Sequence, residues 1–386
     1  MREAAGSDER PRASLRIAGN AIFFPAAALY ALFVVPASVL AMTGVVGAFP
    51  ALSTPTGHAY EMLFGYALGV VAGNQLGPMP LPRIALLAGC WALARVAFLT
   101  GPQSLASAAF NIVFALLLAA HIAPRLVRAA KKWRNQALPL VLVAICASSV
   151  VFQLASPAMA AAELHRIPIV AVILFAMLML FMGGRIIAPT VAGQFHRQGR
   201  KLQARVQPQI EAALLVLMTI ASVASALRAQ SVFLFVAAAA TIAAGVLAAV
   251  RIVRWRIWAL RGRRDLVCLA AGYAWLALGL ILYGTALIAG RYEIAALHVI
   301  TVGSLGTLTI NVMAMTWTLK RRLDPSHASL NIAASLLIAG ATLARVLVAI
   351  DLDRRTAWLV AAAVCWSSAF ALLLLHFAGA RNGRRR

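Results

Sequence analysis

The chain of 386 residues is 62% hydrophobic and only 12% charged, with a mean hydropathy of +0.87. A soluble domain carries nearer a quarter charged residues, so the composition excludes an ordinary soluble fold and favours a membrane protein. The net charge of +24 lies in short clusters between apolar runs. Such clusters are typical of cytoplasmic loops that meet anionic lipid, and they argue against a nucleic-acid-binding surface.

Twelve apolar stretches approach or reach the roughly 20 residues that a helix needs to cross a ~30 Å hydrocarbon core. The first is about 25 residues long, whereas the apolar core of a cleaved signal peptide has only ~7–15 residues. We therefore predict an all-α transmembrane bundle (18–379) between an N-terminal tail (1–17) and a basic C-terminal tail (380–386). The predicted spans are 18–42, 58–77, 81–99, 103–122, 137–157, 166–190, 207–227, 230–252, 266–289, 293–318, 328–350 and 356–379.

The charges of the loops predict the orientation of these spans. Basic clusters fall after every second span, whereas the intervening loops carry few basic residues. The positive-inside rule then places both termini in the cytoplasm. The clusters include Arg125 to Arg134, Arg197 to Arg205, Arg251 to Arg264, Lys320 to Arg322 and the arginines at the C-terminus.

The cysteines lie singly within apolar runs, without a CxxC or CxxCH motif. We expect them to be buried free thiols rather than metal ligands. They are Cys90, Cys146, Cys268 and Cys365.

The span 58–77 carries ionisable residues at its outer end. His58 and Glu61 are three residues apart and would share one face of a helix. Gly65, Gly69 and Gly73 follow at fourfold spacing. Such a stripe allows close approach either of another helix or of a flat cofactor. The histidine and glutamate at the same end favour a functional site, because ionisable residues inside a membrane are costly.

The span 293–318 carries a second histidine at a matching depth. Gly303 and Gly306 follow His298, and Thr301 and Asn311 add polar groups. A buried imidazole is either hydrogen-bonded to a neighbouring helix or a metal or haem ligand. Two histidines at matching depth, His58 and His298, favour the ligand interpretation.

Some arginines within the spans are candidates for the site, and their partners are open at this point. Arg185 lies near the cytoplasmic end of the span 166–190, where it either snorkels to the interface or marks a distorted helix end. Arg95 and Arg345 lie towards the outer ends of their spans, where either one can pair with Glu61 or meet an anionic group such as a haem propionate. His165 begins the span 166–190 on the outer side and is a further candidate for the histidine group.

Three segments resemble signature motifs of the NnrS family. The run H-x-x-E-M-L-F-G-Y extends from His58 to Tyr66 and is followed by VVAG. GGRIIAP resembles the central element of the family, and H-x-x-T-V-G-x-x-G begins at His298 and is followed by VMAM. The motifs occur in the family's order, and the length and span count extend the resemblance over nearly the whole chain.

The resemblance implies a bacterial inner-membrane protein of about twelve helices that is associated with haem and copper. It implies a part in denitrification or in resistance to nitric oxide and related nitrosative stress. His58 and His298 would be the metal or haem ligands, and Glu61 and Arg185 would be supporting polar residues. One departure is clear: the family's G-H-T-G-R run is replaced by RRLDPSH, which ends at His327.

Other functions are compatible with the same residues. A secondary transporter would use His58, Glu61 and Arg185 in a proton- or ion-coupled pathway. A scaffold for a respiratory enzyme is a further alternative. No catalytic motif is established, although a haem-based redox activity is compatible with the histidines.

Overall fold

The computed structural model describes residues 15–130, 133–260, 262–323 and 329–382 and shows a bundle of long helices. The α-helices are α1 (Gly19–Met42), α2 (Pro55–Tyr60), α3 (Leu68–Gln75), α4 (Leu81–Thr100), α5 (Leu105–Ala129), α6 (Trp133–Ala155), α7 (Ala161–Leu164), α8 (Arg166–Arg197), α9 (Pro208–Ala226), α10 (Ser231–Trp255), α11 (Arg264–Ala289), α12 (Glu293–His298), α13 (Thr307–Lys320), α14 (Ser329–Ile350) and α15 (Arg355–Asn382).

Short elements of other types complete the described fold. The 3-10 helices are η1 (Pro50–Ser53), η3 (Gln203–Arg205) and η4 (Ile257–Leu260), and the π-helices are η2 (Glu61–Ala67) and η5 (Val299–Gly306). Two-residue strands, β1 (Arg16–Ile17) and β2 (Met79–Pro80), pair antiparallel, with Arg16 opposite Pro80.

The predicted all-α membrane fold is confirmed. Among the described residues, 11 helices are long and apolar enough to cross a membrane. The span predicted at 58–77 forms the continuous helical run α2–η2–α3, which is not one of these 11 because its polar residues and glycines make it less apolar. Its length is nevertheless about 30 Å at 1.5 Å per residue. The predicted spans 81–99 and 103–122 are separated only by Thr100-Gly101-Pro102, and the chain does break there between α4 and α5.

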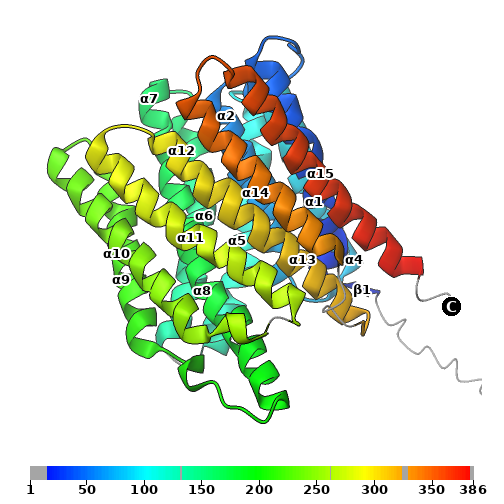
Figure 1. Cartoon of the computed structure of the whole chain (residues 1–386). Coiled ribbons are helices and arrows are strands. Elements are labelled where there is room, and N and C mark those ends of the chain that lie inside the picture. The colour runs from blue at the N-terminus through cyan, green and yellow to red at the C-terminus, as the bar shows by residue number, and fades with distance from the viewer. Residues whose placement is uncertain (1–14, 131–132, 261, 324–328, 383–386) are drawn as a thin grey trace, which may run out of the picture.

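Both ends of the described chain lie at the same end of the bundle, as an even number of crossings requires. Figure 1 shows α2, α7 and α12 at one end, and β1 and the end of α15 towards the other. We refer to the first as the α2/α7 end and to the second as the terminal end. The cytoplasmic location of the terminal end is a prediction from loop charge. Most residues of the predicted tails lie outside the described residues, as does His327.

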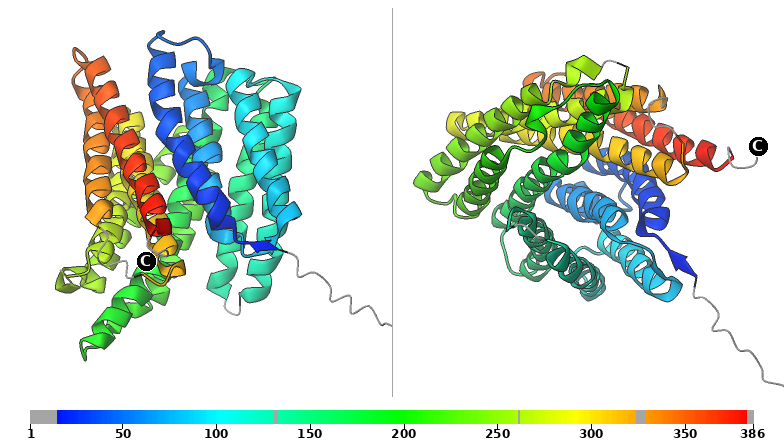
Figure 2. Two further views of the ribbon diagram at one scale, coloured as in Figure 1. Left: turned by 90° about the vertical axis from the view of Figure 1, so that its right-hand side faces the viewer. Right: turned by 90° about the horizontal axis from the view of Figure 1, so that it is seen from below.

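Helices α4 to α6 lie on one side of the bundle and α9 to α14 largely on the other, as the view from below in Figure 2 shows, whereas α1 packs against α15. Helix α8 contacts elements of both groups, including α6, α9 and α11. It is longer than predicted and ends at Arg197 rather than at residue 190. Its apolar part is almost entirely buried, because it is surrounded by other helices rather than by lipid.

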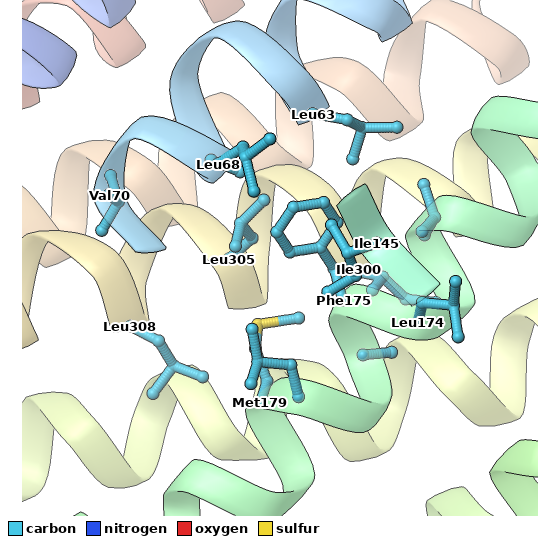
Figure 3. Packing of buried hydrophobic residues seen from close by; sticks show 14 of the residues in the cluster. Leu63, Leu68, Val70, Ile145, Leu174, Phe175, Met179, Ile300, Leu305 and Leu308 are labelled. Carbon is cyan, nitrogen blue, oxygen red and sulfur yellow. The ribbon is translucent and has the colours of Figure 1, made fainter. Parts of the chain in front are cut away.

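The two spans that carry the family motifs meet at the centre of the bundle. Figure 3 shows Leu68 and Leu305 from these spans close to Phe175 and Met179 of α8. Tyr66 hydrogen-bonds to Thr309 across the interface. The two motifs are therefore packed together although they are far apart in sequence.

Both motif spans have the same construction. Each begins at the α2/α7 end with a six-residue α-helix that contains a histidine, continues as a π-helix and then returns to α-helix. A π-helical segment adds a residue to the turn and is frequent at functional sites. The change of period also alters which side chains share a face, so the α-helical spacing of His58 and Glu61 does not fix their relative direction.

Candidate functional site

His298 has a hydrogen-bond partner for each ring nitrogen. Its Nδ1 lies 2.6 Å from the Ile294 carbonyl oxygen, and its Nε2 lies 2.7 Å from Nη2 of Arg345. A guanidinium can only donate, so Nε2 must be the acceptor and Nδ1 must carry the hydrogen. The backbone carbonyl thus fixes the tautomer and directs the Nε2 lone pair towards Arg345. This arrangement resembles that of metal-binding histidines, whose non-ligating nitrogen commonly donates to a carbonyl.

His58 lies within electrostatic range of both His298 and Arg345. Its Nδ1 atom is buried and has no hydrogen-bond partner among the described residues. A buried nitrogen that lacks a partner loses its hydration without compensation. We call His58, His298 and Arg345 the histidine cluster. The structure thus brings together the two histidines that the sequence singles out.

His165 lies at the edge of this cluster. Its Nδ1 is 3.1 Å from the hydroxyl oxygen of Thr56, which precedes His58 by two residues on α2. Arg228 and Glu293 form an ion pair that is close enough to His165 to affect it electrostatically. The predicted outer group of histidines is therefore assembled at the α2/α7 end, with His165 near its rim.

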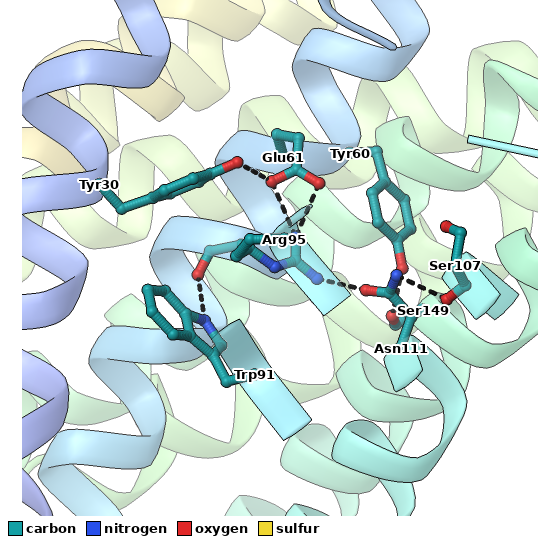
Figure 4. Close-up of polar contacts among 9 residues, drawn as sticks. Tyr30, Tyr60, Glu61, Trp91, Arg95, Ser107, Asn111 and Ser149 are labelled. Carbon is teal, nitrogen blue, oxygen red and sulfur yellow. Dashed lines mark hydrogen bonds and ion pairs between the residues drawn. The ribbon is translucent and has the colours of Figure 1, made fainter. Parts of the chain in front are cut away.

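Glu61 belongs to a second polar cluster, shown in Figure 4. Nη1 of Arg95 donates to both carboxylate oxygens of Glu61 at 2.8 Å, and the Tyr30 hydroxyl donates to one of them. Nη2 of Arg95 donates to the Asn111 side chain. The exposed fractions of Glu61 and Arg95 are 0% and 3%. We call Tyr30, Glu61, Arg95 and Asn111 the ion-pair cluster.

These contacts decide between the partners that the sequence left open for the arginines. Arg95 on α4 pairs with Glu61, whereas Arg345 on α14 binds His298. The sequence does not single out Tyr30 and Asn111 as partners of this pair. They lie 31 residues before and 50 residues after Glu61, in apolar spans where a single tyrosine or asparagine carries no local signal. Only the packing of α1, α4 and α5 around η2 reveals them.

The glycine stripe is filled by side chains of neighbouring helices. A Cβ on Gly73 would lie 2.4 Å from Cδ1 of Phe24, and one on Gly69 would lie 3.3 Å from Nε1 of Trp91. The same Trp91 nitrogen donates to the Gly65 carbonyl oxygen at 2.9 Å. The stripe therefore serves close helix packing rather than the approach of a flat cofactor.

The glycines of the second motif also serve packing. A Cβ on Gly303 would lie 3.1 Å from Trp275, and one on Gly306 would lie 2.9 Å from Trp366. Asn311 donates to the Thr307 carbonyl and to the Ser335 hydroxyl, so its polar side chain has partners within the bundle.

Arg185 lies far from both clusters. It follows His165 by 20 residues on α8, which places it about 30 Å further along the helix. Its guanidinium lies 4.6 Å from the ring centroid of Phe181. The structure therefore does not bring Arg185 to His58 and Glu61, and the transporter hypothesis lacks a compact site that joins the three residues.

The histidine cluster provides few protein ligands for a metal. Within the described ranges, no group of three or more His, Cys, Asp and Glu side chains is placed to hold a metal ion. Haem iron requires only one or two axial side chains, because the porphyrin supplies the other ligands. The unpartnered His58 nitrogen, the fixed His298 tautomer and the cationic Arg345 therefore fit haem better than a bare metal ion with an all-protein ligand set.

A helical bundle with imidazoles inside the membrane region defines a multi-pass membrane protein with an intramembrane polar site. The family model described as NnrS protein matches residues 18–382, so the chain belongs to the NnrS family. Comparisons with curated proteins and with solved structures found no match.

Proposed function

We propose that this protein binds haem at the histidine cluster and contributes to resistance to nitric oxide and nitrosative stress, or to denitrification, in the bacterial inner membrane. The observation that carries the proposal is the buried, unpartnered Nδ1 of His58 beside His298. Membership of the NnrS family supports the same role.

The residues of the cluster would have distinct roles. His58 and His298 would hold the haem iron, and the Ile294 carbonyl would hold His298 in the tautomer that leaves Nε2 able to bind a metal. Arg345 would then be available to a haem propionate, which a guanidinium recognises well. Haem, when bound, would supply an iron that takes nitric oxide in place of one of the two imidazoles. Copper is a further candidate, since imidazole also suits that metal.

The position of the cluster suits a small apolar ligand. Nitric oxide is uncharged and can enter from the lipid, so the site needs no polar channel. The neighbouring apolar helices would lower the local dielectric, which would tune both ligand access and the potential of a bound haem.

The test is the absorption spectrum and metal content of the purified protein. We expect a Soret band in the wild type and its loss in His58→Ala and His298→Ala. His121→Ala is the matched control, because His121 lies on α5 and bonds to its own helix, at the Leu117 carbonyl. A wild-type protein without haem or metal, or equal loss in the control, would overturn the proposal.

A further inference from the structure

A second candidate site lies between the two motif spans, on the terminal side of the histidine cluster. A cavity of about 90 Å³ is found between α3, α8, α11 and the run η5–α13. All three segments that resemble family motifs contribute to its wall. Val70 belongs to the first, Gly183 to the second, and Leu305 and Val312 to the third. The cavity is therefore the place where the three segments meet.

The inner wall of this cavity is apolar and buried. Figure 3 shows the side chains of Val70, Leu305, Leu308 and Met179 in this part of the bundle. Their exposed fractions lie between 5% and 8%. Within the described part of the chain, no charged side chain lines the cavity. An ion would lose its hydration here without a countercharge, so the wall disfavours a charged occupant.

The polar side chains of the cavity do not line up to hold water inside it. Thr309 Oγ1 donates to the Leu305 carbonyl oxygen at 2.6 Å and hydrogen-bonds to the Tyr66 hydroxyl, so this hydroxyl is already occupied. Asn74 and Gln75 lie at the rim, where Asn74 is exposed. A buried water typically makes about three hydrogen bonds, which the side chains of the inner wall do not offer. The inner cavity therefore suits an apolar occupant.

The volume limits the occupant to a very small molecule. An engineered apolar cavity of about 150 Å³ binds benzene or xenon. A cavity of about 90 Å³ is too small for such a ring but accepts a single xenon atom or a diatomic gas. The polarizable thioether of Met179 adds dispersion contacts to an occupant of this kind.

Small side chains keep the cavity open. Ala67, Val70, Val71 and Val312 line it, and a larger side chain at one of these positions would fill the space. Protein interiors are otherwise close-packed, and an empty cavity lowers stability. A bound molecule would restore the missing contacts.

The double glycine of the segment GGRIIAP fixes the backbone on the α8 side of the cavity. A Cβ on Gly183 would lie 2.3 Å from the Tyr273 ring, and one on Gly184 would lie 2.2 Å from Nη2 of Arg251. Helix α8 is thus held closely against its neighbours here, and the cavity is bounded by tightly packed backbone on this side.

We propose that this cavity binds a small, uncharged, apolar molecule of the size of a diatomic gas. Nitric oxide belongs to this class, and its choice as the natural occupant rests on the proposed function. Leu308 follows His298 by ten residues, so the cavity lies roughly 15 Å along the motif span from the histidine cluster. It is a separate site that holds the gas inside the bundle, rather than a part of the haem site.

The test uses xenon as the probe, on crystals of the full chain prepared without haem. Xenon is uncharged, polarizable and a strong anomalous scatterer, and we expect one xenon site inside the cavity. Val312→Phe places a ring in the cavity and should lower the xenon occupancy by about tenfold or more. Val70→Leu adds a single methylene and should lower the occupancy less, and it keeps the test valid should the larger substitution prevent folding. A failure of the protein to bind haem leaves this test unaffected.

Val364→Phe is the matched control, because it makes the same change on α15 at a side chain that is 58% exposed. It should keep the wild-type xenon occupancy. Absence of xenon from the wild-type cavity, or unchanged occupancy in both cavity variants, would overturn the proposal. Bromide, which also scatters anomalously, should stay out of the cavity. Bromide in the cavity, or electron density for a hydrocarbon chain there, would overturn the gas in favour of an anion or a lipid.

Discussion

The histidine cluster and the ion-pair cluster each include one residue of the same motif span, His58 and Glu61, but satisfy their polar groups differently. Glu61 has partners at both carboxylate oxygens, and Arg95 has partners at two of its three nitrogens. The histidine cluster instead combines two imidazoles with one guanidinium and leaves His58 Nδ1 unpartnered among the described residues. An ionisable residue inside a membrane domain is energetically costly, but the comparison shows that it need not be a ligand of a metal or cofactor. A paired charge holds helices together, whereas an unpaired nitrogen can bind something else.

The largest expected effect comes from breaking the ion pair. Arg95→Gln leaves the Glu61 carboxylate without its countercharge, and loss of one partner of a buried pair costs about 3–5 kcal/mol. Reversible unfolding in detergent would measure the loss. The haem content of the protein that remains folded should not change, because neither residue belongs to the histidine cluster.

The double variant Glu61→Gln with Arg95→Gln provides the control for that prediction. It removes both charges and should recover part of the stability that Arg95→Gln loses, which a double-mutant cycle would show. A cost below about 1 kcal/mol for Arg95→Gln would contradict the structural role. Loss of haem from the folded variant would show that the two clusters form one functional site.

The glycine stripe tests the packing role of the same span. Gly73→Ala forces a methyl group against Phe24, and overpacking of this kind costs about 1–3 kcal/mol. Gly89→Ala on α4 is the matched control, because a Cβ there meets nothing within 4 Å among the described residues. It should stabilise the protein by about 0.5–1 kcal/mol, since alanine is the better helix former. Equal stability of the two variants would show that the stripe is not packed as described.

The sequence could predict much of the fold because hydropathy and loop charge are local signals. The span boundaries, the break at Gly101 and the meeting of His58 with His298 follow from such signals and from a shared depth in the membrane. The partners of Arg95 and Arg345 could not be predicted, because they depend on how each helix is rotated about its axis. The π-helices make that rotation harder still to infer, since they change the period directly after each histidine-bearing helix.

The residues of the candidate site could also be predicted only in part. His58 and His298 could be named because histidines inside apolar spans are rare, whereas Tyr30 and Asn111 are unremarkable in their own helices. Arg185 is grouped with the histidines both by the family resemblance and, in the transporter hypothesis, as an ionisable residue inside a span. Its distance along α8 argues instead for a role at the terminal end, with Gly183 and Gly184 explained by Arg251 and Tyr273.

The smallest effect on stability is expected from Arg345→Met. This variant also gives the finest distinction between the two clusters. The substitution removes the hydrogen bond to His298 but leaves both imidazoles, so stability should fall by only about 1 kcal/mol. The haem affinity should fall by about tenfold, because the variant lacks the cation that would meet a haem propionate, and the Soret band should persist at high haem concentration. Titration of the purified variant with haem would measure this. Complete loss, as expected for His298→Ala, would make Arg345 indispensable to the site, and an unchanged affinity would mean that Arg345 makes no contact with the bound haem.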